Sequence, residues 1–166
     1  MWTKFACIAC FLLLAGCGTT RPPHIERLPG DITRIESLPA DAHSELSMVA
    51  LSQLGIPYAN GGNTPEQGFD CSGLVNYVYK QATGLSLPRT TFALFKIGRV
   101  IEEEGLQPGD LVFYNTLSRA YSHVGIYLGE ERFIHAPSSG GVVRIESMRS
   151  DYWMQRYNGA RRLLPG

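Results

Sequence analysis

The chain has 166 residues, of which 44% are hydrophobic and 18% charged, and its 15 basic residues balance its 15 acidic ones. A chain of this length and composition can bury a core large enough for one domain to fold unaided. The zero net charge and the scattered arginines, with only a small cluster at Arg156, Arg161 and Arg162, are not those of a nucleic-acid-binding protein.

Residues 1–16 are predicted to be a secretory signal rather than part of the fold. Phe5 to Ala15 is an apolar stretch that is shorter than the roughly 20 residues needed to cross a bilayer. The sequence Leu14-Ala15-Gly16-Cys17 resembles a bacterial lipobox, which implies cleavage before Cys17 and lipid on its sulfur. Gly18 then resembles an outer-membrane address, which implies a lipid anchor facing the periplasm. The alternative is an ordinary signal peptide that is followed by a cysteine by chance.

The cysteines leave a single thiol in the predicted mature domain. Of the 4 cysteines, Cys7 and Cys10 lie in the signal and Cys17 would carry lipid. Cys71 then has no partner for a disulfide in an exported protein. Because a free thiol is a chemical liability outside the cytoplasm, Cys71 is a candidate for a function.

The remaining chain divides into a tether at residues 17–43 and one folded domain at residues 44–166. The tether is rich in proline and polar residues, which disfavours a packed structure. Apolar residues at helical spacing predict helices near 44–54, 71–83 and 91–97. Short β-branched and aromatic segments predict strands at 110–115, 123–129, 132–136, 141–146 and 157–164. Helices followed by antiparallel strands are typical of an α+β fold.

Cys71 is predicted to lie in the first turn of the second helix. Asp70 before it is a typical N-cap residue, and the free N–H groups and dipole of a helix start stabilise an anion. Such a position, with a nearby histidine, can lower the pKa of a thiol from about 8.5 to roughly 3.5–7.5. Leu74 and Val78 share a helix face with Cys71, so the thiol points toward whatever the helix packs on. The alternative is that Cys71 simply fills the core.

Two histidines lie on predicted strands. A three-residue loop at 129–131 would make His123 and His135 diagonal neighbours on one face of a hairpin. Each alone could be structural, but together with a cysteine at a helix start they favour a catalytic site. Metal binding is the competing use of these residue types, but the predicted domain offers only one cysteine and two histidines, without C-x-x-C or H-E-x-x-H spacing. We therefore predict neither a metal nor a cofactor.

Four blocks in order resemble those of the NlpC/P60 cysteine peptidases, namely DCSGLV (70–75), PGDLVFY (108–114), SHVGIYL (122–128) and FIHA (133–136). The resemblance covers roughly residues 46–163. It implies a minimal papain-like α+β fold, with N-terminal helices packed on a central antiparallel sheet. It also implies cleavage of peptide bonds in bacterial peptidoglycan.

Roles for individual residues follow from this resemblance. Cys71 would be the nucleophile, His123 the general base and His135 the residue that orients His123. The attacked carbonyl would become an oxyanion and then a thioester. The backbone N–H of Cys71 and the Tyr58 hydroxyl would donate hydrogen bonds to the oxyanion. Tyr58 could instead be a loop aromatic that only covers the core.

Candidate substrate contacts surround the cysteine. Asp70 could receive an amine of a stem peptide, Ser72 could hydrogen-bond the peptide, and Arg89 could pair with a carboxylate bidentately. Asp70 and Ser72 could equally be cap residues only, and Arg89 could fix a loop. The Gly/Ser-rich segment 137–143 is expected to border the cleft.

These inferences predict a lipid-anchored cysteine endopeptidase of the cell envelope that hydrolyses stem or cross-link peptides of peptidoglycan. One alternative is a lipoprotein that binds wall peptides or a protein partner without turnover. A second alternative uses the same thiolate for acyl transfer to an amine.

Overall fold

The computed structural model describes residues 42–139 and 141–164. The predicted signal, the lipidation site at Cys17 and nearly all of the predicted tether lie outside the described residues. Within them, no helix has the length and apolar character that spanning a membrane would require.

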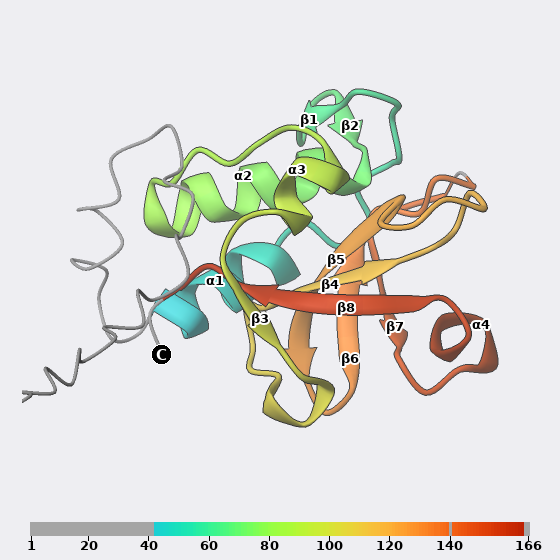
Figure 1. Ribbon diagram of the computed structural model, residues 1–166. Helices are drawn as coiled ribbons and strands as arrows, with labels where there is room; N and C mark the ends of the chain where they lie inside the picture. Colours follow the sequence, from blue (N-terminus) through green and yellow to red (C-terminus); the bar gives the residue numbers. More distant parts are fainter. Residues whose placement is uncertain (1–41, 140, 165–166) are drawn as a thin grey trace, which may run out of the picture.

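The described chain starts with helices and continues as an antiparallel sheet (Figure 1). The helices are α1 (Ala42–Leu51), α2 (Cys71–Thr83), α3 (Thr91–Phe95) and α4 (Asp151–Met154), with a 3₁₀ turn η2 (Glu103–Gly105). A small sheet pairs β1 (Asn63–Thr64) with β2 (Gly68–Phe69). The main sheet contains β3 (Arg99–Ile101), β4 (Leu111–Tyr114), β5 (His123–Gly129), β6 (Arg132–His135), β7 (Arg144–Ser147) and β8 (Tyr157–Arg162).

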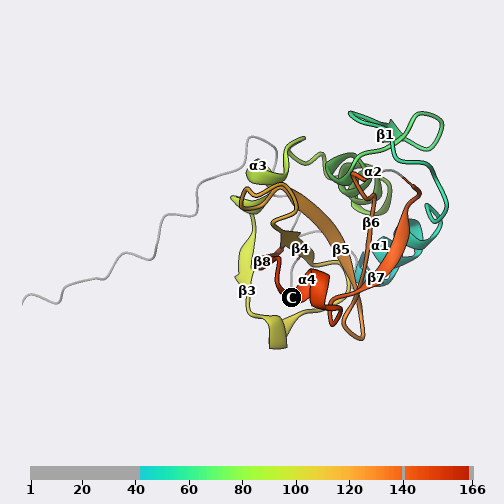
Figure 2. The same ribbon diagram turned by 90° about the vertical axis from the view of Figure 1, so that its right-hand side faces the viewer.

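The six strands of the main sheet lie in the order β3-β8-β4-β5-β6-β7, and each neighbouring pair is antiparallel. Figures 1 and 2 show α1 and α2 together on one side of this sheet and α4 on the other. The prediction of an α+β fold with helices packed on a central antiparallel sheet is therefore confirmed.

Alternation along the strands gives the sheet a buried core on each face. The core on the helix side joins α1 and α2 to strand residues such as Phe113, Val124 and Ile126. The core on the opposite face contains Tyr114, Phe133 and Trp153, the last from α4. A fully buried side chain of this size contributes roughly 1.5–3 kcal/mol relative to an exposed one, so both cores hold the sheet in place.

The N-terminus of α2 is fixed by a cap and by a close backbone approach. Asp70 Oδ1 accepts a hydrogen bond from the N–H of Gly73 at 2.7 Å. A Cβ on Gly73 would lie 2.0 Å from the carbonyl oxygen of Gly62, a distance that no side chain can occupy. Glycine at position 73 therefore lets the loop before the helix pack directly on its first turn, which carries Cys71.

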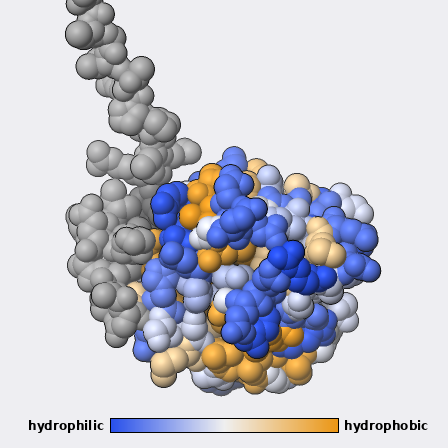
Figure 3. Space-filling model, turned by 90° about the horizontal axis from the view of Figure 1, so that it is seen from below, coloured by the Kyte–Doolittle hydropathy of each residue, from blue (hydrophilic) through white to orange (hydrophobic). Residues whose placement is uncertain are grey.

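The surface of the domain is mixed. Figure 3 shows one face, seen from below, on which hydrophilic residues predominate and hydrophobic residues form separate patches. Such a distribution is usual for a globular domain, because apolar atoms always contribute much of the accessible surface.

Candidate active site

His123 and His135 form a buried, hydrogen-bonded pair on the neighbouring strands β5 and β6. His123 Nε2 lies 2.7 Å from His135 Nδ1, and the ring planes are perpendicular with their centroids 4.9 Å apart. The side chains of both residues are almost entirely buried. The prediction that the hairpin places the two imidazoles together is confirmed.

The hairpin achieves this with a different turn from the one predicted. Its loop has two residues, Glu130 and Glu131, both with positive φ (50° and 56°), the geometry of a type I′ turn. A loop of even length would by itself place the histidines on opposite faces. The register shifts between Tyr127 and Gly129, so Leu128 is an extra residue that restores the common face. The three-residue loop was wrong, and a two-residue turn with a bulge replaces it.

Trp153 closes the apolar side of the histidine pair, and sequence reasoning missed it. Its ring stacks on His123 at 5.7 Å between centroids and meets His135 edge-on at 5.1 Å. Burial lowers the pKa of His123 to about 4. Burial, followed by the charges of His123 and Arg144, lowers the pKa of His135 to about 2. Both imidazoles are therefore neutral at neutral pH.

Cys71 is the first residue of α2 and is partly buried. Its sulfur interacts with the backbone N–H groups of Val124, Ser72 and Cys71 itself. Val124 directly follows His123, and α2 packs against β5. The start of α2, which carries Cys71, therefore lies beside the start of β5, which carries His123.

The resting thiol is not the predicted thiolate. Burial, followed by the negative charge of Asp70, raises the pKa of the Cys71 thiol to about 11, although the three backbone N–H groups act in the opposite direction. The expectation of a lowered pKa was wrong because it counted the helix start and left out desolvation. A neutral thiol beside a neutral imidazole remains suited to chemistry in which His123 takes the proton as the sulfur attacks.

The pH dependence of alkylation tests this protonation state. Because the pKa of the Cys71 thiol is raised, its thiolate fraction should grow about tenfold per pH unit between about pH 6 and about pH 9. We expect the rate of carbamidomethylation by iodoacetamide, followed by mass spectrometry of the peptide containing Cys71, to rise in the same proportion without a plateau. A fast, pH-independent rate across this range, lost in His123→Ala, would instead show a preformed thiolate–imidazolium pair.

Asp70, Ser72 and Arg89 form one hydrogen-bonded group beside the thiol. Arg89 donates to both carboxylate oxygens of Asp70 at 2.7 and 2.9 Å and to Ser72 Oγ at 2.6 Å. Burial would raise the pKa of Asp70, but Arg89 and the N–H of Gly73 outweigh it and hold that pKa below its ordinary value. In this arrangement Arg89 joins its own loop to the first turn of α2. Substrate contacts by these three residues stay predictions.

Tyr58 lies in the loop that leads to α2, close enough to Cys71 for the two to interact electrostatically. Its N–H donates to the carbonyl of Gly141 at 2.8 Å, which ties this loop to the segment before β7. Burial, followed by the charges of Cys71 and Asp70, raises the pKa of Tyr58. The phenol therefore keeps its proton and can donate a hydrogen bond.

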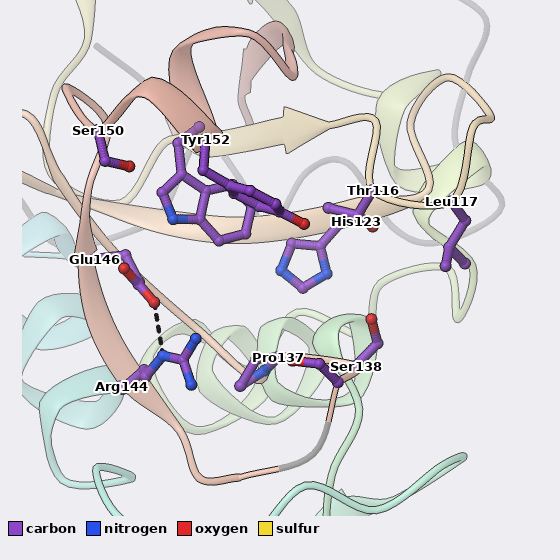
Figure 4. Close-up of a pocket in the computed structure, with 11 residues that line it drawn as sticks. Thr116, Leu117, His123, Pro137, Ser138, Arg144, Glu146, Ser150 and Tyr152 are labelled. Carbon is purple, nitrogen blue, oxygen red and sulfur yellow. Dashed lines mark hydrogen bonds and ion pairs between the residues drawn. The ribbon is translucent and has the colours of Figure 1, made fainter.

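A cavity of about 580 Å³ opens beside His123. Figure 4 shows that it is bordered by Tyr152 of α4, by Arg144 and Glu146 of β7, and by the loop at Pro137. Sequence reasoning missed the two charged residues of β7. Residues 137–139, which belong to the segment expected to border the cleft, line this cavity. Across residues 42–139 and 141–164, no group of three or more His, Cys, Asp or Glu side chains is placed to hold a metal ion.

Known proteins are similar to this chain in sequence and in fold. The chain is 42% identical to the probable endopeptidase NlpC of Escherichia coli over 154 residues, which cover 92% of this chain and 94% of that protein. It is 41% identical to the murein DD-endopeptidase MepH of Escherichia coli over 136 residues, which cover 75% and 50% of the two chains.

Among solved structures, the fold is similar to that of RipD from Mycobacterium tuberculosis. The TM-score is 0.59 at 27% identity, covering 74% of this chain and 98% of that one. RipD is described as a non-catalytic NlpC/p60 domain protein adapted to peptidoglycan binding.

Several curated relatives are longer proteins, of which this chain spans 31% to 57% of the length. The model of the NlpC/P60 family matches residues 55–162, the segment that carries Cys71 and both histidines. This match and the identity to NlpC confirm the resemblance found in the four sequence blocks. The chain belongs to the NlpC/P60 family.

Proposed function

We propose that the protein is a cysteine endopeptidase that hydrolyses peptide bonds in the stem or cross-link peptides of peptidoglycan. The observation that carries this proposal is the 2.7 Å pairing of His123 Nε2 with His135 Nδ1, next to the helix start that bears Cys71. The names of its relatives support peptidoglycan as the substrate, since they include murein endopeptidases.

In the proposed reaction, His123 acts through the nitrogen that His135 leaves free. Its Nε2 is engaged by His135, so Nδ1 takes the proton from Cys71 while the sulfur attacks the peptide carbonyl. The same proton then passes to the leaving amine, and a thioester remains on Cys71. Water, deprotonated by His123, hydrolyses the thioester and releases the acid. The proton that His123 takes from this water returns to the departing sulfur of Cys71, so water is the only reactant besides the peptide.

The oxyanion that forms during attack needs hydrogen-bond donors. The backbone N–H of Cys71 at the start of α2 and the hydroxyl of Tyr58 fill this role in the proposal, because both lie close to the sulfur. Removing one such donor typically costs roughly 10²–10³ in rate. Asp70 and Ser72 remain the proposed contacts for the polar ends of a stem peptide.

The proposed location is the cell envelope, with a lipid on Cys17 that anchors the protein in the outer membrane on its periplasmic side. The sequence Leu14-Ala15-Gly16-Cys17 supports this proposal. More than one acyl chain would hold the protein firmly, since a single chain binds a membrane only marginally. Mass spectrometry of the purified mature protein should find an N-terminal Cys17 carrying lipid. An unmodified N-terminus at another residue would contradict the anchor.

Binding of wall peptides without turnover is the second candidate function, and the similarity to RipD supports it. The two functions differ in what Cys71 is needed for. If the protein acts by hydrolysing peptides, a cell that carries Cys71→Ala in place of the wild-type protein should behave like a cell that lacks the protein. It should behave as wild type if the protein only binds them.

A further inference from the structure

The buried ring of His135 has one nitrogen that no hydrogen bond within the described residues satisfies. Its Nδ1 faces His123 Nε2 at 2.7 Å, whereas its Nε2 is inaccessible to solvent and has no hydrogen-bond partner. Buried polar groups in native proteins are nearly always paired. An acceptor for Nε2 should therefore lie close by.

The proposed mechanism decides which nitrogen of His135 carries the proton. If Nδ1 of His123 accepts the proton of Cys71, its Nε2 must be the protonated nitrogen, and it donates to His135 Nδ1. Neutral His135 is then protonated on Nε2, because a neutral imidazole has one donor and one acceptor. The opposite tautomer of His135 would donate from Nδ1 to His123 Nε2. His123 would then present an N–H to the thiol and could not act as its base.

A carboxylate lies beside this Nε2. Glu146 Oε1 is 3.9 Å from His135 Nε2, about 1 Å beyond hydrogen-bond distance. In the register of β6 and β7, Phe133 pairs with Glu146 and His135 with Arg144, so the β7 pair lies on the same sheet face as His135. Arg144 Nε donates to the same Glu146 oxygen at 2.7 Å, and Figure 4 shows this pair in the wall of the cavity that His123 lines.

The positive charge of Arg144 affects the protonation state of His135. A carboxylate alone beside His135 would favour the imidazolium form, which has no acceptor to offer His123. The positive charge of Arg144 acts in the opposite direction and contributes to the lowered pKa of His135, after burial and His123. The titratable and charged groups that face His135 are His123 from β5 and Arg144 and Glu146 from β7, while α4 contributes the neutral ring of Trp153.

We propose that Glu146 is a positioning residue of the site. When its side chain moves about 1 Å closer, its carboxylate accepts the Nε2–H of His135 and so fixes the tautomer in which His123 can act as a base, while Arg144 neutralises the carboxylate and keeps His135 uncharged. The inference rests on the proposed function, because it assumes that His123 takes the proton of Cys71.

Turnover of a defined muropeptide by the full chain tests this role. Glu146→Ala should lower kcat roughly 10–100-fold, as loss of a partner that orients a functional histidine does elsewhere, with KM unchanged. Glu146→Gln should keep most of the rate, because its amide oxygen accepts the same N–H. Glu130→Ala, which removes the exposed Glu130–Arg132 ion pair at 2.6 Å, is the matched control and should leave kcat unchanged.

Arg144→Ala tests whether the Glu146–Arg144 pair controls the protonation of His135 or is only an ion pair that stabilises its strand. It should raise the pKa of the His135 imidazole, followed by the ring ¹⁵N chemical shifts in an acid titration of the full-length protein, because the positive charge of Arg144 contributes to lowering that pKa. If Glu146 and Arg144 only stabilise their strand, both alanine variants will change kcat by the same small amount. The kcat of Glu146→Gln will then not differ from that of Glu146→Ala. That result would overturn the inference.

A second measurement does not depend on turnover. In full-length Cys71→Ala protein, ring ¹⁵N chemical shifts should show His135 protonated at Nε2, and this tautomer should be lost when Glu146→Ala is added but kept with Glu146→Gln. A proton on Nδ1 of His135, or no change with Glu146→Ala, would overturn the inference. Absence of turnover by the wild-type protein would contradict the proposed function. The spectra would still show whether Glu146 accepts a hydrogen bond from His135.

Discussion

Replacing Cys71 by alanine is expected to abolish peptide hydrolysis, with a fall in kcat/KM on the order of 10⁴-fold or more. The sulfur is the atom that would bond to the substrate carbonyl, and no other thiol lies in the described residues. The measurement is the rate at which a defined muropeptide is converted to cleaved products, with substrate and products resolved by liquid chromatography and mass spectrometry.

A matched control distinguishes lost chemistry from a disturbed fold. Val78 lies on the same face of α2 and is fully buried, so Val78→Ala removes at least as much packing as Cys71→Ala. Val78→Ala should unfold at a lower temperature and still turn over substrate. A Cys71→Ala variant that keeps more than about one hundredth of the wild-type rate, where a true nucleophile leaves far less, would contradict the assignment.

Replacing His123 by alanine is expected to lower kcat by roughly 10²–10⁴-fold, the contribution of a positioned general base. The effect should lie near the upper end of this range, because burial raises the pKa of the Cys71 thiol to about 11 and leaves little thiolate without a base. Added imidazole, which can diffuse to the thiol, should restore part of the lost rate.

His43 provides the control for this substitution, since it lies on α1 and hydrogen-bonds the carbonyl of Pro108. His43→Ala should keep kcat. A His123→Ala variant as active as His43→Ala would show that another group takes the thiol proton, and the proposed roles of His123 and His135 would both fail.

The parts of the site that local sequence determines were predictable. Asp70 caps α2 at the expected residue, and α2 begins at Cys71 because the cap and the apolar face of the helix lie within one segment. The strands carrying His123 and His135 were also predicted, since β-branched and aromatic residues recur in both segments. The fold class follows from the order of these elements.

Features that depend on packing between distant segments could not be predicted. Trp153 reaches the histidines from a four-residue helix, too short to leave a periodic pattern. The bulge at Leu128 keeps His123 and His135 on the same face of the sheet, although the predicted length of the loop between their strands was wrong. The raised pKa of Cys71 depends on how deeply the helix start is buried, and the Glu146–Arg144 pair depends on the register of β7 with β6.

Hydrolysis itself is tested most directly by incubating the wild-type protein with a panel of defined stem and cross-linked muropeptides and measuring the masses of the products by mass spectrometry. Cleavage should give two fragments whose masses together exceed that of the substrate by one water, and prior alkylation of Cys71 should prevent it. If a protein whose Cys71 alkylates normally leaves every muropeptide of the panel intact, the central claim is contradicted.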